Sequence, residues 1–180
     1  MTNLMNILLI WVACLATCFS QTQPKEPNRY CSEKFNFCAT YPAYALPDKV
    51  SLTKGEGILL KSVDGFAEVV IESFPADEEE NTKSVFFDSV KKITPSENGP
   101  KIISSLFGED FYECYFLIER LYCYHRCFLL DGHFVRVQIK VPINMPDKLQ
   151  ILQQQIHLDF NVSPEQEKTS FGPAIGSLKD

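Results

Sequence analysis

Apolar and polar residues alternate with the period of a β-strand in the first part of this chain. In "KFNFCATYP" (34–42), Phe35, Phe37 and Ala39 alternate with Asn36 and its polar or small neighbours, and a proline ends the run. This pattern predicts a half-buried strand. The apolar runs "GILLKS" and "AEVVIESF" are separated by "VDGF". An Asp-Gly pair between such runs predicts a β-hairpin, because both turn positions favour positive φ.

The period changes to that of a helix in "NTKSVFFDSVKKI". Phe86, Val90 and Ile93 recur at spacings of four and three, and two lysines stand in the last turn. We therefore expect a helix from about 82 to 93. The chain from 101 to 142 then favours β-strands, with a second Asp-Gly turn and a closing proline.

A second helical stripe precedes the C-terminal tail. Asn144 is a candidate N-cap and Pro146 stands in the first turn. The apolar stripe consists of Leu149, Leu152, Ile156 and Phe160. The spacing predicts an amphipathic helix of about 145 to 159. The predicted fold class is α+β, with a central, mostly antiparallel sheet flanked by the two helices.

The first 20 residues have the composition of an export signal. They contain no charged side chain, and Ile7 to Ala16 is an apolar run too short to span a bilayer comfortably. We expect a signal peptide over residues 1–20, cleaved after Ser20, and no stable membrane span thereafter. A lipid anchor through Cys18 is the alternative, since Leu15 stands three residues before that cysteine. The expected location is secreted or periplasmic.

The rest of the chain is expected to form one domain with flexible ends. Residues 21–30 are polar and carry two prolines, which is typical of a leader. About 160 residues remain after the signal, enough for a single α+β domain, which we place at 31–160. We expect a mobile tail at 161–180.

Charge and motif content argue against several function classes. The net charge is −6, and no block of Lys or Arg offsets it. Neither nucleic acid nor an anionic lipid surface is therefore an expected partner. The chain also lacks a Gly-rich phosphate loop, a Gly-x-Ser-x-Gly motif and paired metal histidines on a helix. We expect no catalytic residues, no cofactor and no enzyme activity.

The stretch "YCYHRCFLLDGHFVRVQIKV" (122–141) carries the densest candidate chemistry. A two-residue turn at Asp131 and Gly132 would place Cys127, His125 and Cys123 opposite polar residues of the returning strand. These pairs are Cys127 with Arg136, His125 with Gln138 and Cys123 with Lys140. The opposite, apolar face would then meet the core. A tight turn at 119–120 would also set Cys114 opposite His125, which gathers three thiols and an imidazole on one patch.

Three interpretations of this patch remain open. The first is a metal site, for which Cys114, His125 and either Cys123 or Cys127 are the candidates. Cys123 and Cys127 lie about 13 Å apart along a regular strand, so only one of them can bind the same ion as His125. The second is disulfide formation, expected in an exported protein, with unresolved pairing among Cys31, Cys38, Cys114, Cys123 and Cys127. In the third, the cysteines are small hydrophobic residues against a covering helix.

The order of these motifs resembles that of a known fold family. "GEGILLKSVDGFAEVVIES", a helix, long strands ending in "LLDGHFVRVQIKVP" and a helix ending in "HLDF" are similar to small exported bacterial domains with a PsbP-like α/β/α fold. The resemblance covers about residues 33–160 and rests on turn and core positions. It implies an antiparallel sheet flanked by helices and a non-catalytic accessory or binding role, and it carries over no functional residue.

We therefore expect an exported, non-enzymatic binding or accessory domain that contacts an unidentified protein or envelope component. The alternative is a metal-binding or redox-responsive protein that uses the Cys/His patch. Replacement of His125 would abolish metal binding in the second case and harm folding at most in the first.

Overall fold

The computed structural model describes residues 27–53, 56–77, 80–93 and 99–160. The expected signal peptide, the lipidation alternative at Cys18, most of the leader and the C-terminal tail lie outside the described residues.

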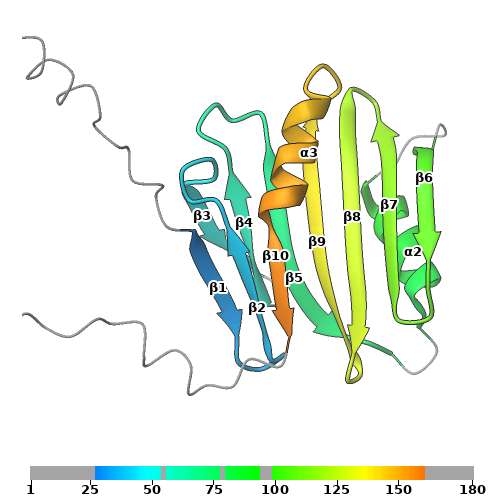
Figure 1. The fold of residues 1–180 in the computed structure, drawn as a ribbon. Coiled ribbons are helices and arrows are strands. Elements are labelled where there is room, and N and C mark those ends of the chain that lie inside the picture. The colour runs from blue at the N-terminus through cyan, green and yellow to red at the C-terminus, as the bar shows by residue number, and fades with distance from the viewer. Residues whose placement is uncertain (1–26, 54–55, 78–79, 94–98, 161–180) are drawn as a thin grey trace, which may run out of the picture.

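In the described residues, the fold consists of two antiparallel sheets and two helices (Figure 1). The larger sheet has seven strands in the order β3 (Asp48–Ser51), β4 (Glu56–Lys61), β5 (Glu68–Pro75), β9 (His133–Pro142), β8 (Leu121–Leu130), β7 (Phe111–Ile118) and β6 (Lys101–Phe107). The smaller sheet has the order β1 (Asn28–Ser32), β2 (Phe37–Tyr41) and β10 (His157–Phe160). The helices are α2 (Thr82–Ile93) and α3 (Pro146–Gln155). The predicted α+β class is confirmed.

The two helices lie on opposite faces of the large sheet (Figure 1). Helix α3 and the small sheet cover one face over β4, β5, β9 and part of β8, which we call the α3 face. Helix α2 packs against β7 and β8 on the other face, which we call the α2 face. Each face has its own apolar cluster, so strands β8 and β9 are buried on both sides.

Turn residues fix the strand register as the sequence indicates. Asp131 (φ 47°) and Gly132 (φ 76°) form the β8–β9 turn, and the predicted pairs Cys127–Arg136, His125–Gln138 and Cys123–Lys140 are confirmed. Glu119 also has a positive φ of 53°, which allows the tight turn between β7 and β8. Cys114 therefore lies opposite His125, as expected.

The β4–β5 hairpin forms through a different turn from the one expected. Gly65 has a positive φ of 70°, but Asp64 is not among the described residues with positive φ. Its carboxylate instead organises the loop by accepting hydrogen bonds from Ser62 Oγ (2.6 Å) and the Phe66 backbone N–H (3.1 Å). Asp64 Oδ2 also lies 2.6 Å from Lys148 Nζ, which ties the loop to α3.

Helix α2 begins and ends where the periodicity predicts. The side-chain oxygen of Asn81 accepts hydrogen bonds from the backbone N–H groups of Lys83 (3.1 Å) and Ser84 (3.0 Å). This is an N-cap interaction, which satisfies donors that have no partner within the helix. The predicted helix of 82–93 is confirmed.

The predicted C-terminal helix forms and starts within one residue of the expected position, but its predicted N-cap residue and its predicted end are wrong. Helix α3 starts after Met145, so Asn144 is not the N-cap, and no side chain caps it. It ends at Gln155 because Ile156 is extended (φ −101°, ψ 118°), and residues 157–160 form β10. The edge of β2 accounts for this difference, since it offers backbone partners that a continued helix would leave unused.

Residues at the start of the domain also differ from expectation. Asn28, Arg29 and Tyr30 belong to β1 and pair with β2, whereas the sequence predicts a flexible leader there. Strand β1 therefore begins before Cys31. The polar composition of this segment does not indicate a strand, but its backbone pairs with β2.

Candidate functional site

The Cys/His patch lies under helix α2 and not on a polar surface. Cys114, Cys123, His125 and Cys127 are at most 1% exposed. The imidazole of His125 lies edge-on to Phe116 (ring centroids 4.7 Å apart) and to Phe86 of α2 (6.4 Å). The expectation that this face of the hairpin is polar is therefore wrong. Alternation along the hairpin shows which side chains share a face but not that a helix covers it.

Burial keeps the groups of this patch neutral. It raises the pKa of the Cys114 and Cys123 thiols to about 11 and that of Cys127 to about 12. Burial, followed by the positive charges of Arg136 and Lys140, holds the pKa of His125 well below its usual value. A neutral thiol is a poor nucleophile and a poor metal ligand. This chemistry favours the interpretation of these cysteines as small hydrophobic residues.

Two observations count against the metal and disulfide hypotheses for the patch, and one concerning His125 favours the first. No group of three or more His, Cys, Asp or Glu side chains in the described part of the chain is arranged to hold a metal ion. The three thiols of the patch are free. Both ring nitrogens of His125 are buried without a hydrogen-bond partner among the described residues.

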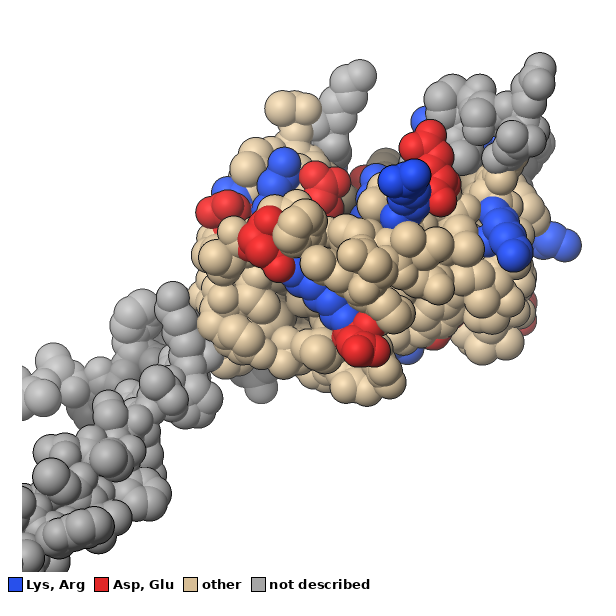
Figure 2. Space-filling model, turned by 90° about the horizontal axis from the view of Figure 1, so that it is seen from above, with Lys and Arg blue, Asp and Glu red and all other residues tan. Residues whose placement is uncertain are grey.

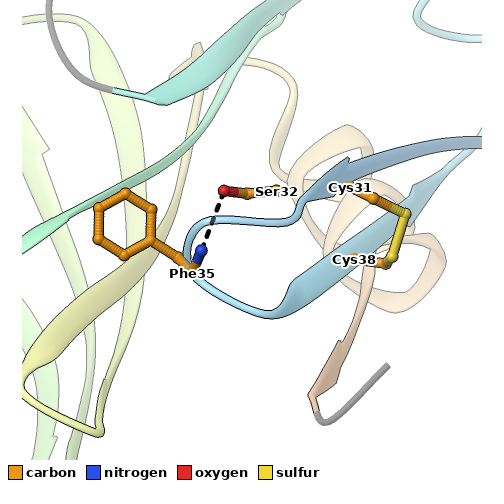
Figure 3. The surroundings of a disulfide bond; sticks show 4 residues. All are labelled: Cys31, Ser32, Phe35 and Cys38. Atoms are coloured by element: carbon orange, nitrogen blue, oxygen red, sulfur yellow. Dashed lines mark hydrogen bonds between the residues drawn. A yellow bond between two sulfur atoms is a disulfide. The ribbon is translucent and has the colours of Figure 1, made fainter. Parts of the chain in front are cut away.

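The disulfide forms between Cys31 and Cys38, which face each other across strands β1 and β2 (Figure 3). Their Cα atoms are 4.1 Å apart. The backbone N–H of Phe35 in the connecting turn donates a hydrogen bond to Ser32 Oγ (3.4 Å), and Ser32 also hydrogen-bonds to the carboxylate of Glu56 on β4. The disulfide-linked hairpin is thereby attached to the large sheet.

A second contact fixes the tip of this hairpin. Nε2 of His133 donates a hydrogen bond to the carbonyl oxygen of Phe35 (3.0 Å), and the two rings lie 5.0 Å apart. His133 begins β9, so the tip rests on the end of the β8–β9 hairpin. The small sheet is held over the large one at this end.

A concave site lies between the large sheet and the α3–β10 segment. It has a volume of about 510 Å³, and we call it the β8–β10 groove. Its lining comprises Tyr124, Arg126, Phe128, Val137, Ile139, Gln153, Ile156, His157, Leu158, Asp159 and Phe160. This size and this mixture of apolar walls with a few polar groups are typical of ligand sites.

Aromatic contacts shape the groove. The rings of Phe128 and Phe160 lie 5.2 Å apart and join β8 to the end of β10. Arg126 lies over the Phe128 ring, 4.9 Å from its centroid, and 3.8 Å from the carboxylate of Glu113. The guanidinium is exposed, so the groove has one cation beside its apolar wall.

The groove continues onto a part of the sheet without a covering element among the described residues. On the α3 face, strands β6 and β7 lie beside α3 and not beneath it (Figure 1). Tyr115 of β7 packs against Tyr124 of the groove, with ring centroids 4.9 Å apart. Phe111 and Leu117 are half-buried, and Leu106 of β6 is 59% exposed. We call the α3 face of β6 and β7, with Leu106, Phe111, Tyr115 and Leu117, the open strands.

A polar cleft of about 450 Å³ lies on the α2 face, between α2 and strands β5 and β9. One carboxylate oxygen of Glu72 accepts hydrogen bonds from Arg136 Nη2 (2.7 Å), Arg136 Nε (3.1 Å) and Gln138 Nε2 (2.9 Å). The Arg136 guanidinium also lies 5.0 Å from the Phe74 ring centroid. The lining carries three acidic and three basic side chains, namely Glu72, Glu80, Asp88, Lys92, Arg136 and Lys140. Opposite charges therefore offset one another.

Charged side chains of both signs lie beside one another on the face seen from above, with no broad patch of one sign (Figure 2). In the described part of the chain, no helix has the length and apolar character to cross a membrane.

Sequence reasoning missed the groove and the Glu72–Arg136 pair. The groove depends on β10, which was predicted as helix, and the ion pair depends on the pairing of β5 with β9. The hairpin turns predict only the pairing of strands that are consecutive in the sequence. Neither the groove nor the ion pair therefore has a signal in the local sequence.

Comparison with known proteins bears on the fold. No protein-family model and no curated protein matches the sequence. The solution structure of cyanobacterial PsbP (CyanoP) from Synechocystis sp. PCC 6803 is similar, with 8% sequence identity and a TM-score of 0.57. The match covers 78% of this chain and 96% of that chain. The fold is therefore PsbP-like, which confirms the resemblance seen in the sequence, and at this identity the likeness concerns the fold alone.

Proposed function

We propose that this chain is an exported, non-enzymatic binding or accessory domain that holds a protein partner in the β8–β10 groove. The observation that carries the proposal is the groove of about 510 Å³, which has aromatic walls and continues onto the open strands. An apolar side chain of the partner would fill the groove, and its neighbouring residues would lie on β7 and β6. Arg126 and Asp159 both line the groove, which favours a partner with charged groups of both signs next to that side chain.

The chemistry of the described residues supports a non-enzymatic role. The reactive residue types of the Cys/His patch are buried and neutral, which makes them unsuitable as nucleophiles or bases. The PsbP-like fold is consistent with such a role, although a fold by itself does not define a function. The apolar run of Ile7 to Ala16 and the Cys31–Cys38 disulfide support export to an oxidising compartment.

Site-specific photo-crosslinking in the exporting cell tests the binding proposal. The probe p-benzoylphenylalanine replaces Phe128 in the groove, and as a matched control it replaces Phe66, which is 52% exposed on the β4–β5 loop. We expect a discrete adduct from position 128 that is absent from position 66 and is lost when Leu158→Asp places a charge in the groove. Equal labelling from both positions, or adducts that survive Leu158→Asp, would contradict the proposal.

The alternative is metal binding or redox sensing by Cys114, Cys123, His125 and Cys127. The unpartnered nitrogens of His125 are the observation in its favour. Intact mass of the exported protein, native and denatured, before and after reduction and alkylation, separates the two functions. One disulfide, three free thiols and no retained ion supports the binding domain, whereas a metal mass lost on His125→Phe supports the alternative.

A further inference from the structure

The charges that line the polar cleft of the α2 face balance in number but not in pairing. Lys92 of α2 and Lys140 of β9 both line the cleft, and the side chain of neither forms an ion pair or a hydrogen bond with a described residue. Asp88 of the lining lies 3.7 Å from Lys91, which does not line the cleft. Two ammonium groups of the cleft are therefore left without an acidic partner in the described part of the chain.

Arg136 adds a third available donor. Its Nε and Nη2 atoms donate hydrogen bonds to Oε1 of Glu72, which also accepts one from Gln138. Nη1 of Arg136 donates no hydrogen bond to a described residue, and it is not one of the buried side-chain atoms that lack a partner, so solvent reaches it. The ion pair is therefore neutral as a whole but leaves N–H groups available to an acceptor in the cleft that it lines.

The unpaired charges lie at opposite ends of the cleft. Thr82 Oγ1 donates a hydrogen bond to the carbonyl oxygen of Gly108 (3.1 Å), so α2 begins at the β6–β7 loop, and the acidic Glu80 precedes it there. Lys92 lies about 15 Å further along the helix axis. Lys140 lies about 23 Å along β9 from the β8–β9 turn, which is at the same end of the sheet as the β6–β7 loop (Figure 1). The end of the cleft away from Glu80 is therefore positive.

Buried polar atoms without a partner lie beside the floor of this cleft. They are both ring nitrogens of His125 and the hydroxyl oxygen of Tyr112, in the part of the chain that the structure describes. His125 stands directly opposite Gln138 of the floor, and the cleft residue Arg136 is a polar neighbour of Tyr112. Burial, and after it the positive charges of Arg136 and Lys140, lower the pKa of His125, and no acidic side chain acts against them. The positive potential at the floor is thus not cancelled by the acids of the cleft.

We propose that this cleft binds a small organic anion, with its carboxylate or phosphate group between Lys92 and Lys140 and its apolar part along Phe74 and Val85. A carboxylate or phosphate accepts several charge-assisted hydrogen bonds at once, which matches two ammonium groups and the Nη1 atom of Arg136. Phe74 and Val85 line the cleft and supply apolar walls. The volume of about 450 Å³ is typical of sites for small molecules.

The net charge of the chain makes this inference specific. At −6, the protein repels anions at long range, so an anion that binds is held by local contacts and not by a general attraction to the surface. The inference does not depend on the proposed function, because the β8–β10 groove lies on the other face of the sheet. Either site can be disproved without affecting the other.

A titration followed by amide chemical shifts in ¹H–¹⁵N spectra provides the first test. The probes are 3-phenylpropionate and phenyl phosphate, and the matched uncharged control is 3-phenylpropanol, all added to the purified chain at about 0.15 M salt. We expect saturable shifts along α2, β5 and β9 with at least one of the anions and none with the alcohol. The anion with the lower dissociation constant identifies the acid group that the cleft prefers.

Charge-removing variants test the position of the acid group. We expect Lys92→Gln and Lys140→Gln each to raise the dissociation constant of the better anion about tenfold or more, because each variant removes a charge-assisted hydrogen bond. The matched control is Lys49→Gln, which removes the same charge from edge strand β3, outside the cleft. It should leave the dissociation constant unchanged within about twofold. Circular dichroism checks that all three variants fold.

Three results would overturn the inference. The first is the absence of saturable shifts with both anions, or equal shifts with the uncharged alcohol. The second is a set of shifts confined to the β8–β10 groove, where Arg126 would then be the cation that binds the probe. The third is a dissociation constant that Lys92→Gln and Lys140→Gln raise no more than Lys49→Gln does, which would show an effect of net charge alone.

Discussion

Acidification should destabilise this protein through His125. The side chain is fully buried, and neither ring nitrogen has a hydrogen-bond partner among the described residues. Its surroundings are the rings of Phe116 and Phe86, the neutral thiols of the patch, and the cations Arg136 and Lys140 on β9. Nothing in this environment compensates a positive charge, so the folded protein excludes the proton that the unfolded chain accepts.

The size of the effect follows from proton linkage. The pKa of His125 is held well below its usual value of 6.5 in the folded state. Between pH 6.5 and that lowered pKa, the unfolded chain therefore binds one more proton than the folded protein. The free energy of unfolding falls as pH decreases, by about 1.4 kcal/mol for each pH unit.

Urea unfolding of wild type and His125→Phe at several pH values between about 7.5 and 4.5 measures this contribution. Phenylalanine fills a similar volume without a titrating group, and the carboxylates titrate in both proteins, so their contribution cancels in the difference. We expect the variant to gain stability relative to wild type as the pH falls below 6.5, with a slope of at most about 1.4 kcal/mol per pH unit. His157→Phe, at an exposed position of β10, is the matched control and should keep the wild-type pH dependence.

Two outcomes would refute this reasoning. Parallel pH dependences for wild type and His125→Phe would mean that the imidazole has a compensating partner in the folded state. A wild type that becomes more stable than the variant as pH falls would mean that the folded protein holds the histidine as a cation, contrary to its uncompensated burial.

The remaining predictions concern stability and are measured by urea or thermal unfolding. Phe86→Ala should reduce the free energy of unfolding by about 3–5 kcal/mol because the ring is fully buried among other rings. Phe87 is exposed, and Phe87→Ala should reduce it by less than about 1.5 kcal/mol. Equal losses would contradict this placement of α2. Replacing Cys31 and Cys38 together by serine should cost about 2.5 kcal/mol, the loop-closure term for eight residues, and no loss would show that the disulfide does not form. Arg136→Met should cost about 2 kcal/mol, because the half-buried carboxylate of Glu72 then loses its cation and keeps only the hydrogen bond from Gln138; a stability gain would show that the ion pair is not needed.

Turn chemistry is what made the hairpins predictable from sequence. Asp131 and Gly132 favour positive φ, so the β8–β9 register and the opposition of Cys127 to Arg136 follow from local residues. The burial of Cys127 does not follow, because it depends on helix α2, more than 30 residues earlier in the chain. Local pattern specifies which residues share a face, and long-range packing decides whether that face is covered.

The end of α3 shows the same limit. Ile156 and Phe160 stand four residues apart and fit a helical stripe as well as a strand. The structure resolves the ambiguity through β2, whose Ala39 pairs with Leu158 and whose Cys38 pairs with Asp159. A segment of four residues has too little intrinsic preference to decide its own conformation, so the available edge decides it.

The disulfide is connected to the groove through the small sheet. Cys38 lies in β2 directly opposite Asp159 of β10, and Asp159 lines the groove. The bond to Cys31 holds β1 against β2, and the hairpin tip is anchored to the start of β9 through His133. The β10 wall of the groove is therefore held by a strand that the disulfide and the tip contact fix at one end. Because the α2 face is covered by a helix or lined by charges that offset one another, the groove and the open strands on the α3 face are where a partner would gain most from binding, and the disulfide stabilises the wall that such a partner would contact.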